Sequence, residues 1–304
     1  MIGTVFLGAV LLFSLGAVVC ELQEKRSEGD ICAYLAGGAS LGAAAALFAA
    51  ILTDDFGYAY VVSYSSIELP LLYKISAFWA GQQGSFLLWL VIHALVGALL
   101  VRRSAMGRAG RIVYQLLTAL LVFLVLIKSP FAYAETIVPD GNGMNPLLQD
   151  PWMAIHPPLV FFGYALLAVP YAASLGALLS EKADSTAWLA LARSWALAAW
   201  ALLGAGIFVG AFWAYKVLGW GGWWGWDPVE NSSLVPWLAA GVLVHLLSAA
   251  RVRPTNLALA HLSSPMRLRS TARSSREAAF WATSPCILSA ARASASGSSP
   301  SMRS

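Results

Sequence analysis

The sequence predicts an all-α, polytopic membrane protein with about seven transmembrane helices and a Trp-rich loop on the outer, periplasmic side. Two observations lead to this fold class. Apolar residues make up 59% of the chain and charged residues only 11%, whereas about 25% of residues are charged in soluble domains. Apolar runs of around 20 residues also recur, which is the length needed to cross a hydrocarbon core about 30 Å thick.

The apolar runs divide the chain into seven predicted spans. The first run is interpreted as a span and not as a cleaved signal peptide, because no basic residue precedes it and charged residues follow it directly. The predicted spans cover residues 2–20, 33–53, 84–101, 113–129, 158–180, 194–214 and 233–250.

The distribution of basic residues predicts the orientation of the spans. Connections on one side, with the segment after residue 250, contain Lys25, Arg26, Arg102, Arg103, Arg108, Arg111, Lys182, Arg193, Arg251 and Arg253. The alternate connections and their edges contain only Lys74, Lys128 and Lys216. By the positive-inside rule, the N-terminus and connections 54–83, 130–157 and 215–232 face outward.

Two classes of function are not expected. The basic residues form no continuous patch, so nucleic acid is not an expected partner, and the lipid bilayer is the expected surrounding. Cys20, Cys32 and Cys286 have neither CxxC nor zinc-ligand spacing, which argues against a thiol-redox role.

The most specific motif is WGGWWGWDPVEN at residues 220–231, within an outer loop predicted at 213–232. Its tryptophans alternate with glycines, which relax the steric limits on the backbone and let indole rings lie flat around a planar ligand. An interfacial aromatic belt is the alternative, but a belt does not require this interleaving. Asn231 or Ser232 is expected to cap the following helix.

A second motif, GNGMNPLLQDPWMAIHPPLVFFGY at residues 141–164, places His156 before Pro157 and Pro158 at the mouth of the fifth span. The two prolines fix the backbone beside the histidine and are expected to begin the helix. A neutral imidazole at a membrane surface can ligate iron. A lone histidine before a helix is more often a cap or a hydrogen-bond partner, so the motif alone leaves both interpretations open.

Two histidines lie inside predicted spans. His245 is expected to face the bundle and to have a partner, either iron or an interhelical hydrogen bond, because an ionisable side chain at that depth is costly. His93 is interpreted as packing. No residue is assigned as catalytic, since Asp227 and Glu230 are explained by attraction to the N-terminal dipole of the next helix.

The composition changes at residue 254. Residues 1–253 form one predicted transmembrane domain, whereas residues 254–304 are rich in Ser, Ala and Arg with Glu277 as the single acid. This composition is typical of a disordered cytoplasmic tail. The preferred interpretation of the change is a shift of reading frame in a GC-rich gene, which would replace the true continuation of the chain with residues of this composition.

Three segments carry a resemblance to one family of membrane proteins. They are YSSIELPLLYKISAFWAGQQGSFLLW (64–89), GMNPLLQDPWMAIHPPLVFFGY (143–164) and WGGWWGWDPVENSSLVPWL (220–238). In this order they resemble the cytochrome c-type biogenesis family CcmF/CycK/NrfE, which is part of the WWD superfamily of haem-handling membrane proteins.

The resemblance implies that the ligand is haem, both as a transient substrate and as a b-type haem within the membrane. It implies that His156 holds the substrate haem over the Trp-rich loop and that His245 ligates the membrane haem, so both are implied iron ligands. The implied haem-binding loop consists of Trp220, Trp223, Trp224, Trp226 and Asp227.

The resemblance also implies a subunit of a haem lyase in the bacterial inner membrane, which takes part in attaching haem to the CxxCH motif of apocytochrome c. The implied partners are a membrane-tethered haem chaperone, apocytochrome c and other cytochrome c maturation subunits. The alternative is a haem exporter or chaperone-loading protein without ligation activity, against which segment 143–164 argues. Family members continue through further spans that supply more histidine ligands, so the chain as written is expected to bind haem weakly and to lack ligation activity.

Overall fold

The structure, a computed structural model, describes residues 2–101, 104–136, 138–179, 187–219 and 222–260. Within these residues the regular structure is helical, apart from one isolated bridge between Tyr58 and Tyr133. The elements in order are α1 (Ile2–Leu22), α2 (Arg26–Leu52), α3 (Ala59–Tyr64), α4 (Leu71–Ala77), α5 (Gln82–Leu100), η1 (Ser104–Met106), α6 (Gly107–Ile127), η2 (Pro146–Leu148), α7 (Pro151–Leu179), α8 (Ala187–Val217) and α9 (Pro228–Ala260).

Seven of the described helices are long and apolar enough to cross a membrane, namely α1, α2, α5, α6, α7, α8 and α9. They confirm the seven predicted spans. Several extend beyond the predicted limits: α8 covers Ala187–Val217, and α9 continues to Ala260, past the domain boundary expected at residue 253. Hydropathy marks only the part of a helix that lies in hydrocarbon, whereas backbone hydrogen bonding continues into the polar ends.

The predicted start of α7 at Pro157 and Pro158 is wrong. Asp150 caps the helix, because its carboxylate accepts a hydrogen bond from the backbone N–H of Trp152 at 2.9 Å. Pro151 takes the first helical position, where a missing N–H costs nothing. The other two prolines therefore lie inside the helix and remove two amide donors near its outer end.

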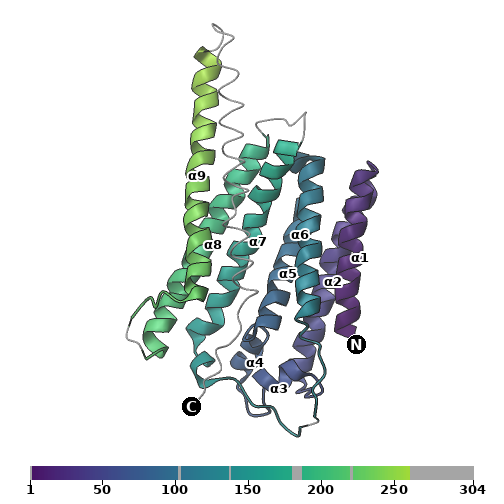
Figure 1. Ribbon diagram of the computed structural model, residues 1–304, viewed down its shortest axis with the longest axis vertical. Coiled ribbons are helices and arrows are strands. Elements are labelled where there is room, and N and C mark those ends of the chain that lie inside the picture. Colours follow the sequence, from purple (N-terminus) through teal and green to yellow (C-terminus); the bar gives the residue numbers. More distant parts are fainter. Residues whose placement is uncertain (1, 102–103, 137, 180–186, 220–221, 261–304) are drawn as a thin grey trace.

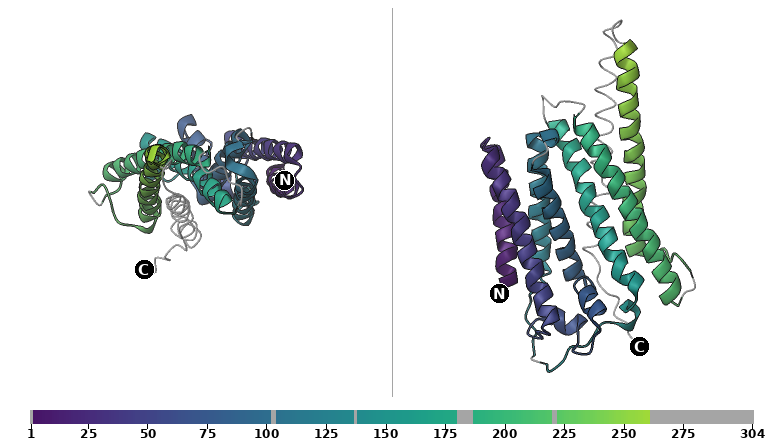
Figure 2. Two further views of the ribbon diagram at one scale, coloured as in Figure 1. Left: turned by 90° about the horizontal axis from the view of Figure 1, so that it is seen from above. Right: turned by 180° about the vertical axis from the view of Figure 1, so that it is seen from behind.

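Successive spans run antiparallel, so their connections alternate between the two ends of the bundle (Figure 1). We call the end with α3, α4 and the 218–227 loop the outer end, after the predicted orientation, and the opposite end the inner end. The spans follow one another across the bundle, from α1 and α2 through α5, α6 and α7 to α8 and α9 (Figure 2). The pair α8–α9 therefore forms one edge of the molecule.

The interior of the bundle contains His93, which agrees with its interpretation as a packing residue. Its side chain is 1% exposed and stacks on Tyr114 of α6 with ring centroids 4.3 Å apart. The Tyr114 hydroxyl donates a hydrogen bond to the backbone carbonyl of His93. At the inner end, Glu21 and Arg111 join α1 to α6 through two hydrogen bonds between carboxylate and guanidinium.

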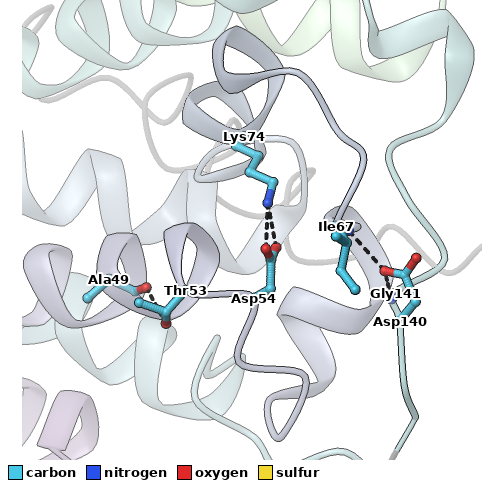
Figure 3. Close-up of polar contacts among 7 residues, drawn as sticks. All are labelled: Ala49, Thr53, Asp54, Ile67, Lys74, Asp140 and Gly141. Carbon is cyan, nitrogen blue, oxygen red and sulfur yellow. Dashed lines mark hydrogen bonds and ion pairs between the residues drawn. The ribbon is translucent and has the colours of Figure 1, made fainter.

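An outer cap, defined as α3, α4 and the segment 128–150, closes the outer end of the first four spans. Lys74 of α4 donates to both carboxylate oxygens of Asp54 at 2.7 and 2.6 Å (Figure 3). Asp140 accepts hydrogen bonds from the backbone N–H groups of Ile67 and Gly141. The contact between Asp140 and Ile67 joins segments from either side of α5 and α6 into one unit.

Tyr60 connects the two short helices of the outer cap. Burial raises the pKa of this phenol, so its hydroxyl stays protonated. The hydroxyl is within hydrogen-bonding distance of the backbone carbonyls of Ala77 and Phe78 at the end of α4, at 2.9 and 3.0 Å. The cap is thus tied together by buried polar contacts as well as by apolar packing.

Candidate functional site

His156 lies between α7 and α8 near the outer end, with its imidazole held against the backbone of α8. Its Nδ1 is 2.7 Å from the carbonyl oxygen of Gly206. A carbonyl can only accept, so Nδ1 carries the proton, and in the neutral ring Nε2 then keeps its lone pair. A Cβ added to Gly210 would lie 2.5 Å from Cε1 of this ring. The missing side chain at Gly210 and the backbone carbonyl of Gly206 together create the seat for the imidazole.

The segment before His156 is fastened to the outer end of α8. Asp150, which caps α7, also accepts a hydrogen bond from the Lys216 ammonium at 2.6 Å. The Trp152 ring packs edge-on against Phe212, with ring centroids 5.0 Å apart. The Trp213 indole donates to the carbonyl of Leu147 at 3.2 Å. These contacts fix the position of the first turns of α7.

The connection after α8 is shorter than the predicted loop 213–232, because α8 continues to Val217 and α9 begins at Pro228. Trp223 folds back onto the outer end of α8. Its ring stacks on Tyr215, with centroids 5.0 Å apart and planes 15° from parallel, and also contacts Phe208 and Phe212. Aromatic side chains of α8 thus form a platform under the loop.

Trp223 and His156 lie on opposite faces of α8. Successive residues of an α-helix are about 100° apart around its axis. The two glycines that contact His156 therefore share one face, while the two phenylalanines under Trp223 share the opposite one. The structure brings both residues to the outer end but places Trp223 on the far side of α8 from the imidazole.

Trp224 and Trp226 form the tip of the loop. Their rings meet edge to face with centroids 6.1 Å apart, and the Trp226 side chain is 71% exposed. The indole N–H of Trp224 is buried and has no hydrogen-bond partner among the described residues. Trp220, also predicted as a site residue, lies outside the described residues.

The first turn of α9 clamps this loop. Glu230 accepts hydrogen bonds from the backbone N–H of Gly225 at 2.8 and 3.1 Å and from that of Asp227 at 3.3 Å. Asn231 donates from its side-chain amide to the carbonyl of Trp226 at 3.1 Å. Trp226 has a φ of +57°, a conformation that is costly for a bulky residue and persists only where its surroundings enforce it.

Asp227 is the residue that caps α9, so the expectation of a cap at Asn231 or Ser232 is wrong. Its carboxylate accepts a hydrogen bond from the backbone N–H of Glu230 at 2.7 Å. Together these two acids form a reciprocal capping box, in which each side chain receives an N–H of the other residue. This geometry agrees with their interpretation as helix-entrance residues.

His245 does not face the interior of the bundle, contrary to expectation. Its side chain is exposed on α9, and Nδ1 lies 2.8 Å from the carbonyl oxygen of Gly241 on the same helix. Trp237 and Ser248 of α9 bond to α8, whereas Leu243 and Leu247 are buried. The histidine falls on the remaining side of the helix, with Nε2 directed away from the carbonyl that holds Nδ1.

Sequence reasoning missed two features of this site. Gly206 and Gly210, which seat His156, were detectable as glycines four positions apart in an apolar run, a spacing that allows close approach to a helix. The clamp formed by Glu230 was detectable from the spacing Asp-x-x-Glu at 227–230, which is typical of a capping box. Its additional contact with Gly225 had no signal in the sequence.

The described residues at the outer end include one oriented imidazole and two indoles of the loop tip. Among them, no cluster of three or more His, Cys, Asp or Glu side chains could hold a free metal ion. His156 instead offers one fixed nitrogen lone pair, as suits iron whose other ligands come from a macrocycle. Trp224 and Trp226 add an unpaired donor and an exposed indole face at the same end of the bundle.

Comparison with known proteins identifies relatives of one kind. The family model described as cytochrome C assembly protein matches residues 79–263. The CcmF cytochrome c-type biogenesis protein of Pseudomonas aeruginosa is 41% identical over 211 residues, covering 67% of this chain and 32% of the relative. That of Escherichia coli is 38% identical over 257 residues, covering 81% and 40% respectively.

Two further comparisons agree with these. The probable cytochrome c-type biogenesis protein NrfE of Escherichia coli is 40% identical over 208 residues, which cover 66% of this chain and 38% of the relative. A solved structure titled cytochrome c heme lyase CcmF superimposes with a TM-score of 0.73 and 26% identity, covering 97% of this chain and 50% of that one. The matched region thus spans between 32% and 40% of the length of these curated relatives.

Proposed function

Because this chain belongs to the cytochrome c assembly protein family, we propose that it is a haem-handling membrane subunit of cytochrome c biogenesis, acting in a haem lyase. Residues 1–253 form the haem-handling domain in this proposal, and residues 254–304 have no role in it. The protein is a multi-pass membrane protein. We assign it to the bacterial inner membrane, with the 218–227 loop on the periplasmic side.

The observation that carries the proposal is the hydrogen bond that orients the His156 ring. Its Nδ1 is committed to the Gly206 carbonyl, which orients the ring and leaves Nε2 as the free ligand atom. In the proposal this nitrogen holds the iron of substrate haem, and the loop at the same end of the bundle contributes the indoles of Trp220, Trp223, Trp224 and Trp226, although Trp223 packs on the opposite face of α8. Asp227 contributes by capping α9 and so shaping the loop.

His245 is proposed to ligate a second haem, of b type, within the membrane. A bound b-type haem supplies one-electron redox chemistry. The contribution of this chain is an imidazole in a defined tautomer, since its Nδ1 is held by the Gly241 carbonyl. The exposed position of the ring requires the opposite side of that haem to be covered by other protein or by lipid.

The proposed partners follow from the family and from the names of the relatives. A membrane-tethered haem chaperone delivers haem to the outer end, and apocytochrome c presents the CxxCH cysteines that receive it. Other cytochrome c maturation subunits complete the assembly. The relatives named for cytochrome c-type biogenesis support these partners.

Haem spectroscopy tests the proposal. The full chain is purified in detergent and titrated with haem, and the absorbance of the Soret band is recorded. His156→Ala and His245→Ala are each expected to remove part of the bound haem, and the double variant nearly all of it. His261→Ala is the matched control, since His261 is given no role. Binding that is unchanged in the double variant contradicts the proposal.

A labelling experiment tests the sidedness of the loop. A cysteine introduced at Gly219, where an added Cβ meets no atom within 4 Å, is expected to react with a membrane-impermeant maleimide in intact cells. Cys20 and Cys32, at the inner end, are expected to react only after permeabilisation. The opposite pattern would place the loop in the cytoplasm and exclude a periplasmic haem site.

Haem ligation in a reconstituted system separates the lyase from the alternative. Transfer of haem from the chaperone to apocytochrome c, dependent on His156, supports a lyase subunit. Haem binding by this chain, with ligation by the other subunits that is unchanged by His156→Ala, favours an exporter or a chaperone-loading protein.

A further inference from the structure

A cation of the neighbouring helix bonds to a residue about one helical turn from His245. Arg193 of α8 donates from Nε to the Ser248 hydroxyl of α9 at 3.0 Å. Ser248 follows His245 by three positions, and side chains three positions apart on a helix have Cβ atoms about 5–6 Å apart. The guanidinium therefore lies about one helical turn from the imidazole, toward the inner end.

One side of the α8–α9 pair is covered by α7. A buried cluster there joins residues of all three helices, namely Ala173, Trp188, Ala192, Ala196, Leu243 and Leu247. On the other side of the pair no described helix is packed, and the side chains of Leu197, Leu238 and Val242 are exposed. His245 continues this exposed row on α9, and Arg193 reaches across the seam between the two helices.

The charge of Arg193 has no counterpart within the described part of the chain. The helix α7 and the helix α8 contain no Asp or Glu, and the single acid of α9 up to Ser248 is Glu230, at the outer end. Arg193 takes part in none of the ion pairs formed by the described residues. Cations in membrane spans are normally paired with acids or carbonyls, because an uncompensated charge is costly there.

We propose that Arg193 binds a carboxylate of the ligand that His245 holds through its metal. The membrane site then recognises a metalloporphyrin with free carboxylate side chains, oriented with these toward the inner end. This inference rests on the proposed function. With Nε engaged by Ser248, the two terminal guanidinium nitrogens remain to donate to the carboxylate, in the fork geometry that suits Arg and not Lys.

Esterified haem tests the proposal directly. The full chain carrying His156→Ala, which removes the outer ligand, is titrated with haem and with haem dimethyl ester, whose carboxylates are blocked. The chain with Arg193 intact is expected to bind haem roughly tenfold more tightly than the ester, the effect of one charge-assisted hydrogen-bond pair. Arg193→Met should reduce haem affinity to that of the ester and leave ester affinity unchanged. Equal affinities for the two ligands in the chain with Arg193 would overturn the proposal whether or not the variant folds.

Controls separate the possible failures. Arg108→Met removes an arginine paired with Glu24 at the inner end and should keep the tenfold preference. The connection 180–186 lies outside the described residues and contains two acids, Glu181 and Asp184. The double variant E181Q/D184N removes these two charges, and it should also keep the tenfold preference for haem over the ester. An equal loss of both affinities in Arg193→Met assigns the residue to packing and rejects the proposal. Failure of His245→Ala to reduce binding of either ligand rejects the proposed membrane haem site itself.

Discussion

The two candidate iron-ligating histidines stand in opposite surroundings. His156 is enclosed between α7 and α8, and its Nδ1 bonds to a carbonyl of a different helix. His245 is exposed on α9, and its Nδ1 bonds to a carbonyl of its own helix. A bond between helices fixes a ring relative to the bundle, whereas a bond within one helix fixes it only relative to that helix. The packing of this chain therefore determines the outer site, while the membrane site stays open on one side.

The largest loss of haem affinity at the outer site is expected from Gly210→Val, which tests whether His156 is held by its packing on α8. The new side chain would collide with the His156 ring, because even a Cβ lies 2.5 Å from it. Overpacking of this kind costs about 1–3 kcal/mol, so the outer haem affinity should fall roughly tenfold or more. The measurement is a haem titration in a His245→Ala background, with Gly219→Val as the matched control. Equal titrations for the two valine variants would show that the ring is not seated on α8.

An intermediate effect is expected from Glu230→Gln. Loss of a charged acceptor for the N–H groups of Gly225 and Asp227 should loosen the loop by about 1–2 kcal/mol. Hydrogen exchange at these two amides should then accelerate roughly tenfold, and outer haem affinity should fall a few-fold while the His245 site is unchanged. Val229→Ala, at a side chain that is 75% exposed, is the control. Unchanged exchange at both amides would contradict the clamp.

The smallest change in haem affinity is expected from Ser248→Ala, at the membrane site. The substitution removes the hydrogen bond that holds Arg193 beside His245, and a single such bond contributes about 1 kcal/mol or less when the site is partly exposed. Haem affinity at the membrane site should fall by about twofold to fivefold, with no change at the outer site. Ser194→Ala, at an exposed serine of α8, should have no effect. A loss at both sites would mean that the two histidines are coupled through α8.

The seven spans and their alternation could be predicted because hydrophobic length is a local property of the chain. The start of α7 could not, because Pro151 and Pro157-Pro158 carry the same local signal for a helix start. What decides between them is the Asp150 side chain, which is free to cap only the first. The cap of α9 was missed for the same reason, since Asp227, Asn231 and Ser232 are all good caps by type.

The end of the bundle at which the predicted site residues of the loops lie could be predicted, but their three-dimensional arrangement could not. The tryptophans and His156 reach the same end of the bundle, as their loops alternate with the spans. The side of α8 on which each one lies depends on where α7 packs, which no single segment encodes. The outward direction of His245 likewise follows from how α9 rotates to place Trp237 and Gly241 against α8.

The outer cap depends on contacts between segments that lie on either side of α5 and α6 in the sequence. Asp140 bonds to the backbone of Ile67, which is 73 residues earlier, and Ala59 bonds to the carbonyl of Ala132. Between these partners lie α5 and α6, so the cap closes only once both helices have been threaded across the bilayer. The cap is therefore completed only after the first four spans are in place.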